Sequence, residues 1–128
     1  MKGYSGIVVA GLLAVIAVFL GVMVVENAEA EVALDARYVA VLLVDGQAYF
    51  GQIEHAGSDY PVLKDVYYVQ RAMNTETKET SNQLVKRGQE WHAPDRMVLN
   101  ARHILFIEPV TEASQVFKLI EESRRQSN

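Results

Sequence analysis

The stretch YVAVLLVDGQAYFGQIEHAGSDYPVLKDVYYVQ, from Tyr38 to Gln70, decides the fold of this chain. It contains three runs of β-branched, aliphatic and aromatic residues, which favour a pleated and half-buried surface. The runs extend over Val39 to Val44, Gln47 to Glu54 and Val62 to Gln70. We therefore predict three consecutive antiparallel strands, with a loop from His55 to Pro61 before the third.

Two glycines in this stretch have structural roles that the sequence predicts. Asp45-Gly46 lies between two apolar runs, and this is a strong hairpin signal because a type I′ turn needs positive φ angles. Gly51 lies inside the second strand. A glycine there costs stability unless the sheet bends sharply or another backbone comes close. We expect Gly46 to serve the turn and Gly51 to serve a bend.

Length and charge restrict the classes of protein to which the chain can belong. Its 128 residues provide room for one small domain beside an apolar N-terminal segment. The formal net charge of −4 argues against a general nucleic-acid binder, because such proteins are normally basic. The chain has no cysteine, which excludes disulfides, thiolate metal sites and a cysteine nucleophile.

The segment Ile7 to Val25 has no charge and no proline. As a helix it would be about 28 Å long, close to the hydrocarbon thickness of a bilayer, so we expect a single-pass transmembrane anchor. A cleavable signal peptide is the alternative, since Lys2 and Ala28-Glu29-Ala30 fit its pattern, although the apolar run is long for one. A buried helix of a soluble protein is the third interpretation.

The charges around this segment predict its orientation. Lys2 precedes it, and the next Lys or Arg after it is Arg37. The positive-inside rule then places the N-terminus inside the cell and the C-terminal domain outside the cytoplasm. We divide the chain into an anchor (1–26), a linker or short helix (27–37), a β-barrel (38–110) and a C-terminal helix (111–128).

A polar insertion, residues 71–96, is expected to interrupt the barrel. Its part from Asn74 to Asn82 contains no apolar residue and predicts an exposed loop or hairpin tip, and Leu84 and Val85 mark a brief strand or turn. We expect the following Trp91 to pack on the barrel edge; a ligand platform or partner anchor is the alternative.

The end of the chain predicts a second hairpin and a helix. The hairpin strands are Met97 to Asn100 and Ile104 to Glu108, and Pro109 is expected to end the second strand. Thr111 is a plausible N-cap for the helix. The helix then carries apolar residues at helical spacing, which predict a face lying against the barrel or a neighbouring subunit: Ala113, Val116, Phe117 and Ile120.

The strand pattern resembles the Sm-like family. The segments VLLVDGQAYFGQIE and VLKDVYYV are similar to that family's first motif, with Gly46 as the turn glycine and Gly51 as the bend glycine, and MVLNARHILFIEPV is similar to the second. The resemblance implies a mainly β fold, a small and strongly bent five-stranded Sm-like (SH3-like) barrel. It also implies that barrels pair into a ring through an edge formed by Met97, Val98, Leu99, Ile104, Leu105 and Phe106.

The family's RNA-contact residues are not matched in this chain. The loop after the second strand reads HAGSDYP and lacks the family's asparagine, and Leu99-Asn100-Ala101 stands where the second motif usually contains Arg-Gly. The resemblance therefore implies a fold and an assembly, and not RNA binding.

Few residues in the sequence are candidates for catalysis, metal binding or ligand binding. His55, His92 and His103 do not have a metal-ligand spacing, and no nucleophile elbow surrounds Ser58, so we expect no metal, no cofactor and no enzyme. The candidate surface for a partner or ligand consists of aromatic and histidine side chains, for which strand packing is the simpler interpretation: Tyr49, Tyr67, Trp91 and His103.

The sequence thus predicts a non-enzymatic, membrane-anchored scaffold or accessory subunit of a membrane complex. Its expected partners are the membrane, copies of itself and other subunits of such a complex. The alternative is an Sm-like module that binds RNA or another ligand, which would require a cytoplasmic domain.

Overall fold

The computed structural model describes residues 11–18 and 34–128. The chain divides into two units, Met1–Ala30 and Glu31–Asn128. In the first unit, residues 11–18 are helical, and no helix within the described ranges has both the length and the apolar character needed to cross a bilayer. Most of the predicted anchor and of the linker lies outside the described residues.

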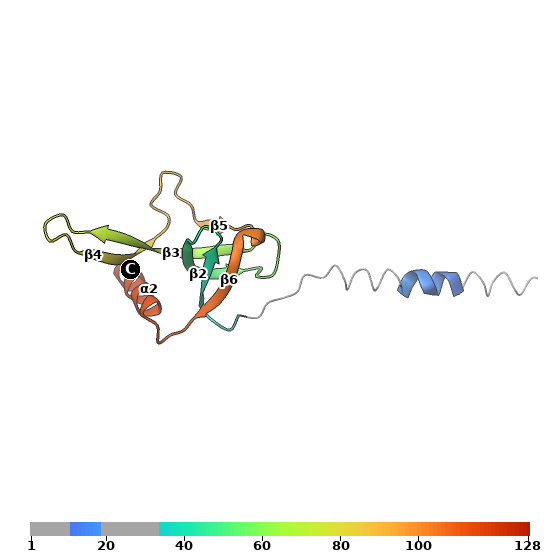
Figure 1. The fold of residues 1–128 in the computed structure, drawn as a ribbon. Coiled ribbons are helices and arrows are strands. Elements are labelled where there is room, and N and C mark those ends of the chain that lie inside the picture. Colours follow the sequence, from blue (N-terminus) through green and yellow to red (C-terminus); the bar gives the residue numbers. More distant parts are fainter. Residues whose placement is uncertain (1–10, 19–33) are drawn as a thin grey trace, which may run out of the picture. The chain divides into compact units, whose positions relative to one another are not determined.

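The second unit is an antiparallel sheet with one C-terminal helix (Figure 1). Within residues 34–128 the sheet has six strands in the order β4-β3-β2-β1-β6, and β5 pairs with β3 off this path. The elements in chain order are β1 (Tyr38–Leu43), β2 (Ala48–Glu54), β3 (Val62–Met73), β4 (Thr80–Lys86), β5 (Arg96–Val98), the 3₁₀ helix η1 (Ala101–His103), β6 (Ile104–Val110) and α2 (Gln115–Gln126).

The prediction of a mainly β fold with a C-terminal helix is confirmed, but the sheet is not a closed five-stranded barrel. The additional strand is β4, which lies in the region expected to be a polar insertion. The end strands of the sheet, β4 and β6, do not pair with each other within the described residues, so the sheet remains open.

The β1–β2 hairpin is present, although its turn is not the predicted type I′. Gly46 has a φ of +88°, whereas Asp45 is not among the residues with positive φ, and a type I′ turn needs two such residues. The Gly46 amide donates to the Leu43 carbonyl, and the Leu43 amide donates to the Gln47 carbonyl. These bonds belong to a longer loop in which glycine takes the left-handed position.

Gly51 lies where another backbone comes close. A Cβ atom on this residue would stand 2.7 Å from the Lys64 carbonyl oxygen of β3. The register between β2 and β3 shifts at this point, and Asp65 on β3 has a φ of +52°. The extra residue is a β-bulge, which bends a strand and increases its twist.

The bulge changes which side chains of β3 face each side of the sheet. Leu63 and Val66 pack with Val39 and Val41 in one core cluster, although a regular strand would place residues three apart on opposite faces. Tyr67 consequently faces the other side. There it belongs to a second cluster with Tyr38, Val110 and Ile120.

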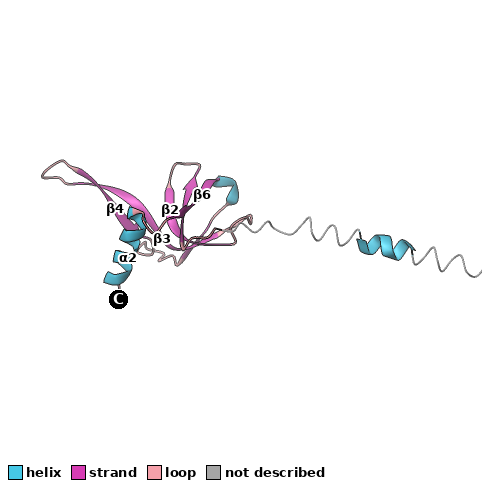
Figure 2. Ribbon diagram, turned by 90° about the horizontal axis from the view of Figure 1, so that it is seen from below, coloured by secondary structure: helices cyan, strands magenta, loops and turns pink. Residues whose placement is uncertain are grey.

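The β3–β4 hairpin extends beyond the other strands. It pairs continuously from Tyr67↔Lys86 to Met73↔Thr80, so β3 is three residues longer than predicted and the exposed tip is shorter. Figure 2 shows this two-stranded ribbon projecting from the sheet, with α2 beside its base.

The predicted second hairpin is wrong. β5 pairs with β3, and β6 pairs with β1, so the two strands joined by η1 contact different parts of the sheet. Pro109 does not end β6, because the pairing continues to Tyr38↔Val110. A proline is tolerated here because β6 is an edge strand.

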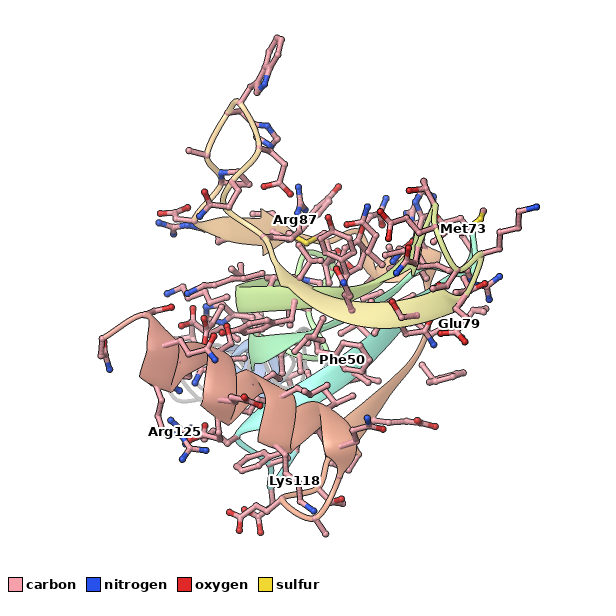
Figure 3. All side chains as sticks on the ribbon, turned by 90° about the vertical axis from the view of Figure 1, so that its left-hand side faces the viewer. Phe50, Met73, Glu79, Arg87, Lys118 and Arg125 are labelled. Atoms are coloured by element: carbon pink, nitrogen blue, oxygen red, sulfur yellow. The ribbon has the colours of Figure 1, made fainter. Side chains whose placement is uncertain are left out.

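The terminal helix α2 covers the second core cluster. Its N-cap is Ser114 rather than Thr111, since the Ser114 hydroxyl accepts a hydrogen bond from the Phe117 amide at 3.1 Å. Ile120 is buried, and Val116 and Phe117 pack around it. Figure 3 shows Lys118 and Arg125 pointing into solvent, so the helix is amphipathic as predicted.

Candidate functional site

The six candidate edge residues divide into a core half and an exposed half. Leu99 is buried, and Met97 and Ile104 pack against the first core cluster. The exposed members are apolar side chains with large exposed fractions: Val98 at 63%, Leu105 at 59% and Phe106 at 46%. Val98 is on β5, and Leu105 and Phe106 are on β6. We call these two strands, with their three exposed apolar side chains, the apolar edge pair.

Both strands of the apolar edge pair have one side without a strand neighbour among the described residues. β5 pairs with β3 through Val62↔Val98 to Lys64↔Arg96, and β6 pairs with β1 along its length. An open strand edge presents unpaired backbone N–H and C=O groups, which are a template for pairing with another chain. Exposed apolar side chains on the same strands add surface that such pairing would bury.

The structure does not bring the four candidate ligand residues together. Tyr67 is buried under α2, which agrees with strand packing, the simpler interpretation, and removes this residue from a ligand surface. Tyr49 packs edge to face on Tyr68, with the Arg87 guanidinium 5.9 Å from its ring centre. His103 is exposed at the end of η1.

Trp91 does not pack on the edge of the sheet as predicted. Its exposed fraction is 106%, which means that no other described residue covers the ring. It belongs to the loop of residues 87–95, which projects from the sheet between β4 and β5 (Figure 1). We call this segment the tryptophan loop.

The base of the tryptophan loop is held by Glu90. Its carboxylate accepts hydrogen bonds from Arg87 Nε at 3.0 Å and from the Gly88 amide at 2.8 Å. These bonds, with the Gly88 amide as the largest cause, lower the pKa of Glu90 to about 2. The carboxylate therefore stays charged well below neutral pH, and its contribution to holding the loop is lost only as the pH falls from about 4.5 through about 2.

Asp65 has a left-handed backbone conformation that its local sequence does not indicate. It lines a groove of about 440 Å³ together with residues of the tryptophan loop and β5. Lys86 Nζ lies 3.4 Å from the Asp65 carboxylate, Arg87 pairs with Glu90, and Arg96 pairs with Asp95. The charges in the groove thus neutralise one another, and none is left free for an ionic ligand. Gly51, opposite the bulge, was the available signal for this irregularity.

The described residues contain no group of three histidine or carboxylate side chains arranged to hold a metal ion. No protein-family model matches the chain, and no curated protein sequence matches it significantly. The sheet edges and the tryptophan loop are the features of the described residues that suggest a function.

Proposed function

We propose that the protein is a non-enzymatic, membrane-anchored scaffold or accessory subunit that assembles with copies of itself through the apolar edge pair. The observation that carries the proposal is the open sheet, whose strands β5 and β6 expose Val98, Leu105 and Phe106 beside unpaired backbone. Pairing β5 of one copy with β6 of the next is a heterologous contact, and such a contact generates a ring when its rotation closes.

Membership of an Sm-like family is part of this proposal. It is supported by the glycine of the first turn, by the bend at Gly51 and by the return of β6 to pair with β1. Membrane anchoring is supported by the uncharged segment Ile7 to Val25.

RNA binding is less well supported than assembly. Five of the described cations lie 2.9–3.4 Å from carboxylates, which reduces the positive charge available to phosphates: Arg37, Lys64, Lys86, Arg87 and Arg96. Affinity for nucleic acid depends mainly on cations that release counterions. We therefore expect the protein not to retain single-stranded RNA at physiological salt.

Light scattering on the unit from Glu31 to Asn128 tests the assembly, because this unit contains both core clusters. We expect a defined oligomer that becomes monomeric when Leu105 and Phe106 are both replaced by glutamate. Met73→Glu is the control, since Met73 is also apolar and is 67% exposed but lies on the β3–β4 hairpin (Figure 3). A parent protein that stays monomeric at high micromolar concentration would contradict the proposal.

A further inference from the structure

The tryptophan loop presents one large apolar side chain to solvent. Trp91 is the only large apolar residue between Arg87 and Asp95. Burying an aromatic ring removes roughly 150–250 Å² from water, so a fully exposed indole is a surface that gains from being covered. At the tip of a projecting loop, this ring is suited to an environment that covers it.

The loop presents Trp91 in an ordered way. The Arg87–Glu90 and Gly88–Glu90 bonds fix its beginning, and the Ala93 amide donates to the Glu90 carbonyl at 2.8 Å. Gly88 and Ala93 both have positive φ, at +125° and +43°. Glycine adopts positive φ without strain, but the φ of Ala93 is strained, and such strain persists where the surrounding structure holds it. Binding through Trp91 would consequently cost little additional ordering of the chain.

The charge distribution of the loop distinguishes between kinds of partner. The residues at its tip, Trp91 to Pro94, include no Lys, Arg, Asp or Glu. Its base carries charges that are already paired, Arg87 with Glu90 and Arg96 with Asp95. The tip can therefore leave water without removing an unpaired ion from solvent, while the charged base stays hydrated.

We propose that Trp91 inserts into the interfacial region of a lipid bilayer and gives the domain a second membrane contact. Tryptophan is enriched at that depth because its ring is apolar and its indole N–H bonds to polar groups. A tryptophan that anchors a protein interface is surrounded by further contact residues that exclude water, and the tryptophan loop has no second large apolar side chain. The inference rests on the membrane anchoring proposed above, since tethering converts a weak contact into an intramolecular one.

Fluorescence of the full chain tests this directly, because Trp91 is its only tryptophan. We reconstitute the protein in phosphatidylcholine vesicles, with and without brominated acyl chains. The expected result is blue-shifted emission, at least twofold quenching by the brominated lipid, and reduced access for acrylamide.

The matched control moves the reporter to another exposed position. In a Trp91→Phe, Met73→Trp variant the indole is on the β3–β4 hairpin, and we expect water-like emission without lipid quenching. Equal quenching of both reporters would overturn the proposal, because it would show non-specific contact of the whole domain with lipid.

Two other results would also overturn it. Water-like emission of Trp91 in vesicles would show that the loop stays in solvent. Blue-shifted emission that brominated lipid does not quench, and that depends on the ratio of protein to lipid, would assign Trp91 to a second copy of the chain. In either case, flotation with the vesicles would still support the proposed anchor, and an oligomer in light scattering would still support the proposed assembly. A chain that does not float with vesicles refutes the anchor, and water-like emission in the same mixture refutes the loop contact.

Discussion

Gly51 is the residue at which the curvature of the sheet depends on a missing side chain. A Cβ atom there would meet the Lys64 carbonyl oxygen at 2.7 Å and the Leu63 side chain at 3.0 Å. Because the nearest atom belongs to the backbone, Gly51→Ala must displace β3 or straighten β2. We expect the free energy of unfolding to fall by about 2 kcal/mol or more in urea denaturation.

Gly46→Ala provides the comparison. Gly46 has open space around its Cα but a φ of +88°, so alanine would suffer backbone strain without a clash. We expect a smaller loss, of about 1 kcal/mol. If Gly51→Ala is the milder of the two substitutions, the close approach of β2 and β3 is not tight.

Two buried tyrosines offer a second test at the scale of single residues. The Tyr38 hydroxyl accepts a hydrogen bond from Arg124, whereas the buried Tyr67 hydroxyl has no hydrogen-bond partner in the described structure. Tyr38→Phe should lower the free energy of unfolding by about 1 kcal/mol, and Tyr67→Phe should leave it unchanged or raise it. Thermal unfolding of both variants measures the difference, and equal losses would show that Tyr67 also has a partner.

The same pair of variants has a pH signature. Burial, followed by the charge of Asp65, raises the pKa of Tyr67. A raised pKa means that this tyrosine contributes stability that is fully present below its ordinary pKa of about 10 and is lost as the pH rises further. Between neutral and strongly alkaline pH, the free energy of unfolding of Tyr67→Phe should therefore decrease less steeply with pH than that of the parent.

At the scale of elements, β6 contains the test of the proposed assembly. Successive N–H groups of a regular strand point to opposite sides, so of Phe106 and Ile107 one donates towards β1 and the other towards the open edge. Proline at the inward position should destabilise the fold, and proline at the outward position should keep the fold and abolish the oligomer.

Circular dichroism and light scattering on the two proline variants separate these effects. Phe106 and Ile107 lie opposite Leu42 and Val41, outside the register shift between Leu42 and Leu43, so both substitutions fall within a regular part of the ladder. An oligomer that persists in both variants would mean that the open edge of β6 is not the assembly contact.

The elements that the sequence predicted correctly are those defined by local pattern. The strands β1, β2 and β3 have β-branched runs separated by turn residues, and α2 has apolar residues at helical spacing. β4 was not predicted as a full strand because its first residues, TSNQ, are polar and exposed on both faces of the hairpin ribbon. A strand without a buried face has no hydrophobic alternation for a sequence to reveal.

Features that depend on distant pairing were predicted less well. Two strands joined by a turn, as in the segment before α2, have the same sequence pattern whether they pair with each other or with other strands. Local sequence therefore cannot distinguish a hairpin from the observed pairing of β5 with β3 and of β6 with β1. Strand packing was the simpler interpretation for Tyr67, but the face of the sheet on which it packs could not be predicted, for a related reason. The bulge at Asp65 changes the alternation of β3, and only the glycine on the opposite strand indicated an irregularity.

At the scale of the whole molecule, the prediction that remains is the topology in the membrane. Because the chain has no cysteine, single cysteines can report it without interference. Ser5 precedes the apolar segment, and Ser81 is exposed on β4. With the N-terminus inside and the domain outside, an impermeant maleimide should label Ser81→Cys in intact spheroplasts and Ser5→Cys only after lysis.

The same two variants separate the alternatives for the N-terminal segment. If a signal peptide is removed after Ala30, the mature protein lacks residue 5, so Ser5→Cys is never labelled and the Ser81→Cys protein appears in the soluble fraction. If the domain is cytoplasmic, Ser81→Cys is protected until lysis, and RNA binding becomes testable in its natural compartment. Only a retained anchor combines a domain outside the cytoplasm with membrane attachment by the apolar segment. The predicted topology therefore requires that Ser81→Cys is labelled in intact spheroplasts and that the protein stays with the membrane after an alkaline wash. Neither the cleaved signal peptide nor the cytoplasmic domain gives this combination.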